Sequence, residues 1–102
     1  MQTSVERLED KVIVQPAEDL VGGGVGELRT MLRNVAGENC RDLVLDLRQV
    51  RMIDSSGIGL LVAAHNSMRR QAGRLSVVHA SADILHLMRS MRIHQHFSVS
   101  GD

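Results

Sequence analysis

A chain of 102 residues, 43% of them hydrophobic and only one aromatic, fits a single globular domain over residues 1–102 with an aliphatic core. Twelve basic and twelve acidic residues give a formal net charge of zero, which disfavours nucleic-acid binding because that function usually needs a strongly positive surface. The polar N-terminus and the lack of an apolar run of about 18 residues predict no signal peptide and no membrane span, so we expect a cytoplasmic protein.

Two short strands are predicted near the N-terminus. Residues 5–8 and 11–15 flank an acidic pair in the pattern of a hairpin, and Pro16 ends the second strand because it has no amide hydrogen to donate. The glycine-rich run at 22–26 lacks the spacing of a phosphate-binding loop, and it predicts a flexible loop that leads into a helix.

Three helices are predicted from apolar spacing. The first has its apolar face at Leu28, Met31, Leu32 and Val35 and ends at Gly37. The second runs from Ser56 to Ala72 and is closed by Gly73. The third follows Ser81 as its N-cap and has its core face at Ile84, Leu87, Met88 and Met91.

Strands are predicted between and after these helices, at 43–47, 75–79 and 97–99. The run at 43–47 is almost continuously apolar, as expected for a central strand covered on both faces, and apolar residues at 50–53 extend it. The alternation of strands and helices predicts an α/β fold with a mixed, largely parallel sheet and helices packed on it.

The most informative segment is the corner where the central strand leads into the second helix. The first amides of a helix have no partner within it, so Asp54, Ser55 or Ser56 is expected to cap them, with Ser56 the better placed of the two serines. The serines could serve only as a cap, act as a nucleophile, or accept a phosphate. A nucleophile elbow needs glycine two residues before and after the serine, and neither serine has it, so we do not expect an enzyme.

The chain resembles the STAS domain family, and in particular the bacterial anti-sigma-factor antagonists, in two blocks: Leu-Val-Leu-Asp-Leu at 43–47 and Met-Ile-Asp-Ser-Ser-Gly-Ile-Gly-Leu-Leu at 52–61. By element order the likeness extends from Lys11 to Phe97. It implies that Ser55 is phosphorylated by a partner anti-sigma factor that is itself a serine kinase, and that a phosphatase reverses this step. The unphosphorylated antagonist would bind the anti-sigma factor and so free the sigma factor. The alternatives are a STAS scaffold or transporter-associated domain that is never phosphorylated, and a small serine hydrolase.

One loop departs from the family pattern. After the second strand the family usually carries Gly-x-Leu-Asp, whereas this chain reads Glu18-Asp19-Leu20-Val21. Val21 therefore stands at the usual acidic position, and Asp19 is a nearby acid that could replace it.

The second predicted helix has two contrasting faces. Its core face consists of Leu60, Leu61, Ala64, Met68 and Ala72. The opposite stripe consists of Gly59, Val62, Ala63 and Asn66, whose small or apolar side chains suit close docking of a partner. Together with Asp54, Ser55, Ser56 and Gly57, this stripe is the predicted partner-binding surface.

The cysteine and histidine content predicts neither a disulfide nor a metal site. Cys40 is the only cysteine and is expected to be a small buried or half-buried residue near the start of a strand. The histidines His79, His86, His94 and His96 are scattered and are not expected to converge on a zinc ion. We therefore expect no metal and no other cofactor.

Overall fold

The structure of the chain is a computed structural model that describes residues 3–36, 39–95 and 97–101. In chain order its elements are β1 (Ser4–Leu8), β2 (Lys11–Gln15), the 3-10 turn η1 (Gly22–Gly24), α1 (Val25–Ala36), β3 (Asp42–Asp46), α2 (Ser55–Arg70), β4 (Arg74–Val78), α3 (Ala82–Ser90), the 3-10 turn η2 (Ile93–Gln95) and β5 (Ser98–Val99). This order confirms the predicted alternation of strands and helices.

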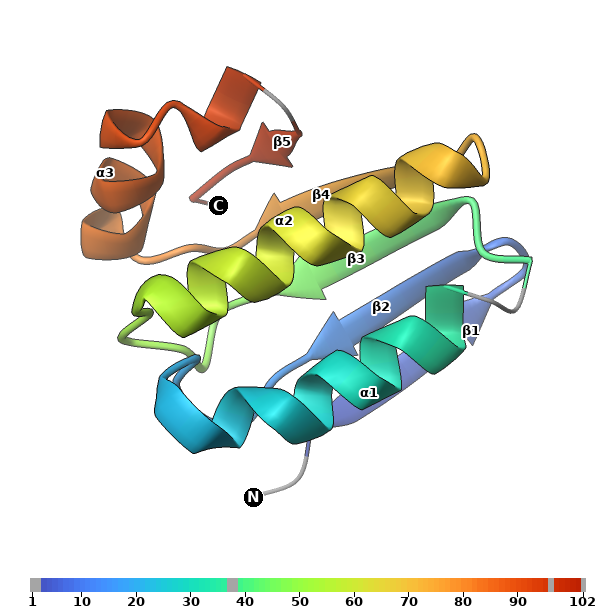
Figure 1. Cartoon of the computed structure of the whole chain (residues 1–102), viewed down its shortest axis with the longest axis horizontal. Helices are drawn as coiled ribbons and strands as arrows, with labels where there is room; N and C mark the ends of the chain where they lie inside the picture. Colours follow the sequence, from blue (N-terminus) through green and yellow to red (C-terminus); the bar gives the residue numbers. More distant parts are fainter. Residues whose placement is uncertain (1–2, 37–38, 96, 102) are drawn as a thin grey trace.

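The five strands form one sheet in the order β1-β2-β3-β4-β5 (Figure 1). β1 and β2 pair antiparallel through a tight hairpin in which Glu9 adopts a φ of 58°. The remaining neighbours, from β2 to β5, pair in parallel. The predicted mixed, largely parallel sheet is therefore confirmed.

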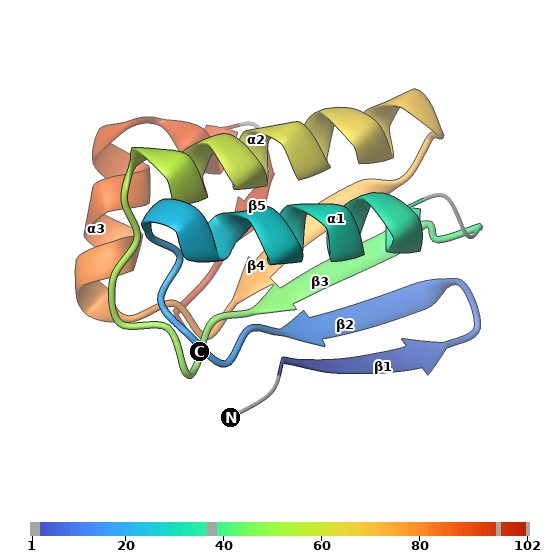
Figure 2. The same cartoon turned by 60° about the horizontal axis from the view of Figure 1, so that its bottom comes forward.

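Helices α1 and α2 lie side by side over one face of this sheet (Figures 1 and 2). The strand order explains the arrangement, because β2, β3 and β4 are added in one direction and right-handed crossovers then place both connecting helices on the same side. The strand residues on that side are buried: Val12, Val14, Leu43, Leu45, Leu75 and Val77. Ile13, Val44 and Val78 on the opposite face are only partly buried, so the prediction that the central strand is covered on both faces is wrong.

The ends of α2 and α3 differ from their predicted bounds. α2 ends at Arg70, because Ala72 takes a left-handed φ of 60° and the amide of Gly73 turns back to the carbonyl of Met68 at 2.8 Å. Ala72 is therefore exposed and does not belong to the core face. Met91 follows the end of α3 and is 51% exposed, so its assignment to a core face was also wrong.

The other helix predictions are confirmed within the described residues. Ser81 caps α3 by accepting a hydrogen bond from the amide of Ile84 at 3.2 Å, and Ile84 and Met88 are fully buried. Leu28, Leu32 and Val35 are buried on α1, and Met31 and Leu87 pack against the core from partly exposed positions. Gly37, the predicted end of α1, lies outside the described residues.

Between β3 and α2 the chain runs as a loop that carries it to the predicted corner. β3 ends at Asp46, so the apolar residues that follow do not extend the strand as predicted. Val50 and Ile53 are buried in the core, whereas Met52 is 61% exposed. Ile53 forms an isolated parallel bridge with Leu20, which brings the loop after β2 beside the start of α2.

Candidate functional site

Ser55 and Ser56 occupy the first two positions of α2, directly after its N-cap Asp54. Asp54 has an extended backbone, with φ −111° and ψ −170°, as N-cap residues usually do. Ser55 is exposed and Ser56 is partly buried. The two serines therefore differ in access although they are adjacent in the sequence.

The carboxylate of Asp54 joins the helix terminus to the loop after β2. Its Oδ1 accepts hydrogen bonds from the amides of Ser56 at 2.9 Å and Gly57 at 3.2 Å. Its Oδ2 accepts a bond from the amide of Gly22 at 3.0 Å. The expected cap is thus Asp54 and not Ser56, which supplies only an amide donor. An aspartate suits this position because the two oxygens of one carboxylate can accept hydrogen bonds from the start of α2 and from the loop after β2.

These bonds stabilise the ionised form of Asp54. The hydrogen bond from Gly22 is the largest cause of a lowered pKa for this carboxyl, desolvation opposes it, and the amides of Gly57 and Ser56 lower the pKa further. Asp54 therefore carries a negative charge at neutral pH immediately before Ser55.

Asp19, in the loop after β2, binds the loop that precedes α2. Its Oδ1 accepts hydrogen bonds from the amides of Arg51 at 2.8 Å and Met52 at 3.3 Å. The backbone of Leu20 adds two hydrogen bonds. Its amide donates to the carbonyl of Met52 at 3.1 Å, and its carbonyl accepts from the amide of Asp54 at 3.2 Å. Sequence reasoning noted Asp19 only as a nearby acid; its partners lie more than 30 residues away, so no local pattern could reveal this role.

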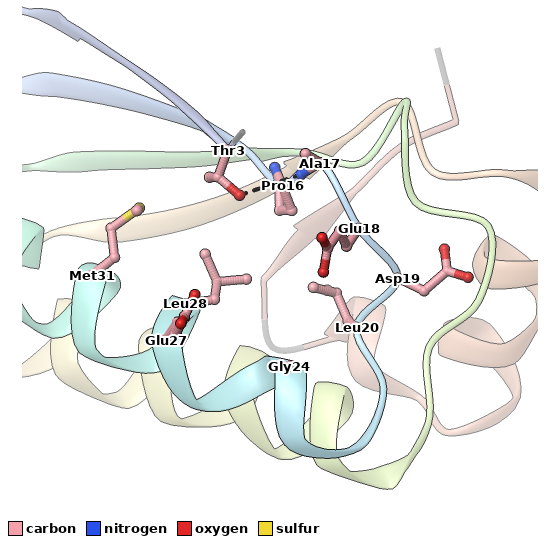
Figure 3. A pocket seen from close by; sticks show the side chains of 10 residues that line it. All are labelled: Thr3, Pro16, Ala17, Glu18, Asp19, Leu20, Gly24, Glu27, Leu28 and Met31. Carbon is pink, nitrogen blue, oxygen red and sulfur yellow. Dashed lines mark hydrogen bonds between the residues drawn. The ribbon is translucent and has the colours of Figure 1, made fainter. Parts of the chain in front are cut away.

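A shallow hollow of about 360 Å³ lies between this loop and α1, and it does not contain the predicted site. Figure 3 shows Glu18 directed into the hollow and Asp19 turned away from it, toward the loop that it binds. The hollow is lined by Thr3, Pro16, Ala17, Glu18, Asp19, Leu20, Gly24, Glu27, Leu28 and Met31. None of the predicted partner-binding residues is among them.

Gly57 is buried where the helix meets the loop. A Cβ atom at this position would lie 2.4 Å from the carbonyl oxygen of Leu20 and 2.5 Å from Cγ1 of Ile53. Gly57 is therefore buried where its lack of a side chain allows two segments to approach closely.

The predicted stripe on α2 is exposed along its length. Gly59, Val62, Ala63 and Asn66 all face solvent, while Leu60, Leu61, Ala64 and Met68 are buried as predicted. From Ser55 to Asn66 the helix rises by about 16 Å. Ser55 and the stripe thus lie along one exposed side of α2, with Val62 as the largest apolar side chain of the stripe.

None of the described histidine and cysteine candidates belongs to the predicted partner-binding surface. His79 pairs through Nε2 with Nη2 of Arg48 at 3.0 Å, and His96 lies outside the described residues. Cys40 is buried as predicted, and this burial raises the pKa of its thiol. Within residues 3–36, 39–95 and 97–101, no three His, Cys, Asp or Glu side chains are grouped as metal ligands. None of the helices described is long and apolar enough to cross a lipid bilayer.

The comparison with known proteins identifies a family over almost the whole chain. The family model of the STAS domain matches residues 2–101. No curated protein sequence matches the chain.

Solved structures share the fold at low sequence identity. An anti-sigma factor antagonist from Mycobacterium paratuberculosis superposes with a TM-score of 0.86 and 19% identity, covering 98% of this chain and 85% of that one. SpoIIAA in its unphosphorylated form superposes with a TM-score of 0.82 and 15% identity, over 95% of this chain and 86% of that one. The phosphorylated form of SpoIIAA, from Bacillus, gives a TM-score of 0.76 and 15% identity, over 95% and 89% of the two chains.

Proposed function

Because the chain belongs to the STAS domain family, we propose that it is an anti-sigma-factor antagonist whose binding is switched by phosphorylation of Ser55. In this proposal residues 1–102 act as one domain. The unphosphorylated form binds an anti-sigma factor, which is also the serine kinase, and the sigma factor is released. A phosphatase restores the binding form.

The position of Ser55 is the observation that carries the proposal. It is exposed at the first turn of α2, at the head of the stripe formed by Gly59, Val62, Ala63 and Asn66. Ser56 is less accessible and its amide is held by Asp54. A kinase could therefore reach Ser55 more easily than Ser56, and a modification there would lie on the surface that a partner covers. SpoIIAA, which has a similar fold, has been solved both with and without phosphate, and this supports the same kind of switch.

The electrostatics of the corner support an effect on binding and not on folding. A phosphate adds about −1.5 to −2 charges at neutral pH. It would stand beside the ionised carboxylate of Asp54, which already accepts the amides of Ser56 and Gly57. Since these amides already donate to Asp54, the charge of the phosphate remains at the surface, where water can solvate it. In a complex the same charge would be desolvated against a closely packed partner, so the cost falls on the complex.

We propose that the chain has no catalytic activity of its own. A serine nucleophile needs a base within hydrogen-bond distance. In the part of the chain that the structure describes, neither Ser55 nor Ser56 has a side-chain hydrogen bond to a histidine. This supports a binding module rather than a small serine hydrolase.

The test is phosphorylation by the serine-kinase anti-sigma factors of the same genome. The purified protein is incubated with each kinase and ATP, and the site is mapped by mass spectrometry in the wild type, Ser55→Ala and Ser56→Ala. We expect one phosphate on Ser55, retained in Ser56→Ala and lost in Ser55→Ala. Phosphate on Ser56 alone would refute the assignment. Stable binding to a partner with no phosphorylation by any kinase would favour the scaffold or transporter-associated alternative.

A further inference from the structure

A groove between α1 and α2 carries an unusual concentration of positive charge. It is a hollow of about 300 Å³ that Arg29 and Arg33 line from α1 and Arg70 lines from α2. Its other lining residues are Leu32, Leu60, Ala63, Ala64, Asn66 and Ser67. Among the described residues no carboxylate lines the groove, although the chain as a whole has equal numbers of acidic and basic residues.

The described part of the chain holds no carboxylate in an ion pair with these three arginines. Within the described residues, the side chain of Arg70 donates to Ser67 Oγ at 3.2 Å, and no ion pair joins it, Arg29 or Arg33 to a carboxylate. Aspartate and glutamate are also absent from the positions three and four residues away, where helix surface pairs form. By contrast, Arg48 pairs with Asp46 and Arg74 pairs with Asp42. Other arginines of the described residues, such as Arg69 and Arg89, also have no ion pair, so what distinguishes the groove is that three arginines without a carboxylate partner line one hollow.

Helix stability explains this arrangement only in part. Arg33 and Arg70 lie in the last turns of their helices, where a cation interacts favourably with the helix dipole. Arg29 lies in the middle of α1, outside that turn. It stands four residues from Arg33, and like charges at this spacing destabilise a helix. An anionic ligand would offset that repulsion.

The groove is continuous with the proposed partner surface, because Ala63 and Asn66 belong to both. We infer that the protein partner presents an acidic segment that lies in this groove and pairs with Arg29, Arg33 and Arg70. The inference rests on the proposed function, since it extends the same interface from the Ser55 corner toward the C-terminal end of α2. Guanidinium groups bind carboxylates in pairs of parallel hydrogen bonds, which fixes the orientation of the acidic segment as well as attracting it. Complementary charge of this kind raises the association rate and makes it sensitive to salt.

The ligand chemistry can be tested without the partner, using octaglutamate as the probe. Amide shifts in ¹H–¹⁵N NMR spectra are followed as octaglutamate is added, with octalysine as the control peptide. We expect shifts at groove residues such as Leu32, Ala63 and Ser67, and none with octalysine. The double variant Arg29→Gln/Arg33→Gln should bind octaglutamate about fivefold more weakly, as expected for the loss of two exposed ion pairs.

A matched control separates the groove from general charge and from helix stability. Arg89→Gln removes an arginine from the last turn of α3 and so loses the same kind of helix-dipole interaction, but Arg89 does not line the groove. It should bind octaglutamate like the wild type. Equal affinity of the double variant and the wild type, or equal shifts around Arg89, would overturn the inference.

A second measurement distinguishes this inference from the proposed function. The double variant should still be phosphorylated on Ser55, while its association with the kinase anti-sigma factor becomes slower and less dependent on salt than that of the wild type. If Ser55 is phosphorylated but association is unchanged in rate and salt dependence, the inference fails and the function stands. If octaglutamate binds in the groove but no kinase modifies Ser55, the proposed function is refuted, while the inference that the groove binds an acidic segment is supported.

Discussion

Replacing Gly57 by alanine should destabilise the protein and disturb the corner that carries Ser55. The added Cβ would lie 2.4 Å from the carbonyl oxygen of Leu20 and 2.5 Å from Cγ1 of Ile53, whereas ordinary contacts begin near 3.4 Å. The helix and the loop must therefore separate by about 1 Å. Overpacking of this kind costs about 1–3 kcal/mol. Alanine in place of glycine stabilises a helix by roughly 0.5–1 kcal/mol, so we expect a net loss of stability of about 1 kcal/mol and at most about 2.5 kcal/mol.

The assay is thermal and urea unfolding followed by far-UV circular dichroism. For a domain of this size the expected loss lowers the Tm by roughly 4–8 °C per kcal/mol. Gly59→Ala is the matched control, because Gly59 lies in the same helix and a Cβ there would meet nothing within 4 Å. It should stabilise the protein by roughly 0.4–1 kcal/mol. If Gly57→Ala proves as stable as Gly59→Ala, the packing argument for Gly57 is wrong.

Three further substitutions test the corner and the stripe. Ser55→Asp should melt near the wild-type temperature yet bind the anti-sigma factor much more weakly; loss of tertiary structure, or unchanged affinity, would contradict the proposed effect of the charge. Ala63→Arg should keep its circular dichroism spectrum, because Ala63 is exposed, and should lose partner binding; an unchanged affinity would remove the stripe from the interface. The folded pKa of Asp54 lies below the ordinary value of 3.8, so its stabilising effect is complete above that pH and is lost as the pH falls through the folded pKa. The difference in urea stability between the wild type and Asp54→Asn should therefore shrink as the pH falls below about 4, and a difference independent of pH would contradict an ionised cap.

Most of the fold was predictable because its signals are local. The spacing of Leu28, Leu32 and Val35 marks one face of α1, and Ser81 is a capping residue just before an apolar helical pattern. The coverage of β3 was not predictable in this way. Its apolar run resembles a strand buried on both faces, but the burial of such a strand depends on where neighbouring strands are added. Strand order is a property of the whole sheet, and here it places α1 and α2 on one side.

The site was predictable in position but not in its internal connections. The corner contains three residues that can cap a helix, and the sequence alone does not rank them. Asp54 is favoured because its second oxygen reaches the amide of Gly22, 32 residues earlier in the chain. The bonds of Asp19 to Arg51 and Met52 and the contact of Gly57 with Leu20 are equally long-range. Such contacts arise only when the loop after β2 and the loop before α2 meet, so the charge and rigidity of the corner emerge from the fold.

The most direct test of the central claim compares the affinities of the phosphorylated and unmodified proteins for the kinase anti-sigma factor. The protein is phosphorylated fully on Ser55, the occupancy is verified by mass spectrometry, and both forms are titrated by calorimetry under the same conditions. We expect the phosphate to weaken binding by about tenfold or more, which corresponds to about 1.4 kcal/mol or more. Equal affinity of the two forms, at full occupancy of Ser55, would contradict a switch at this residue.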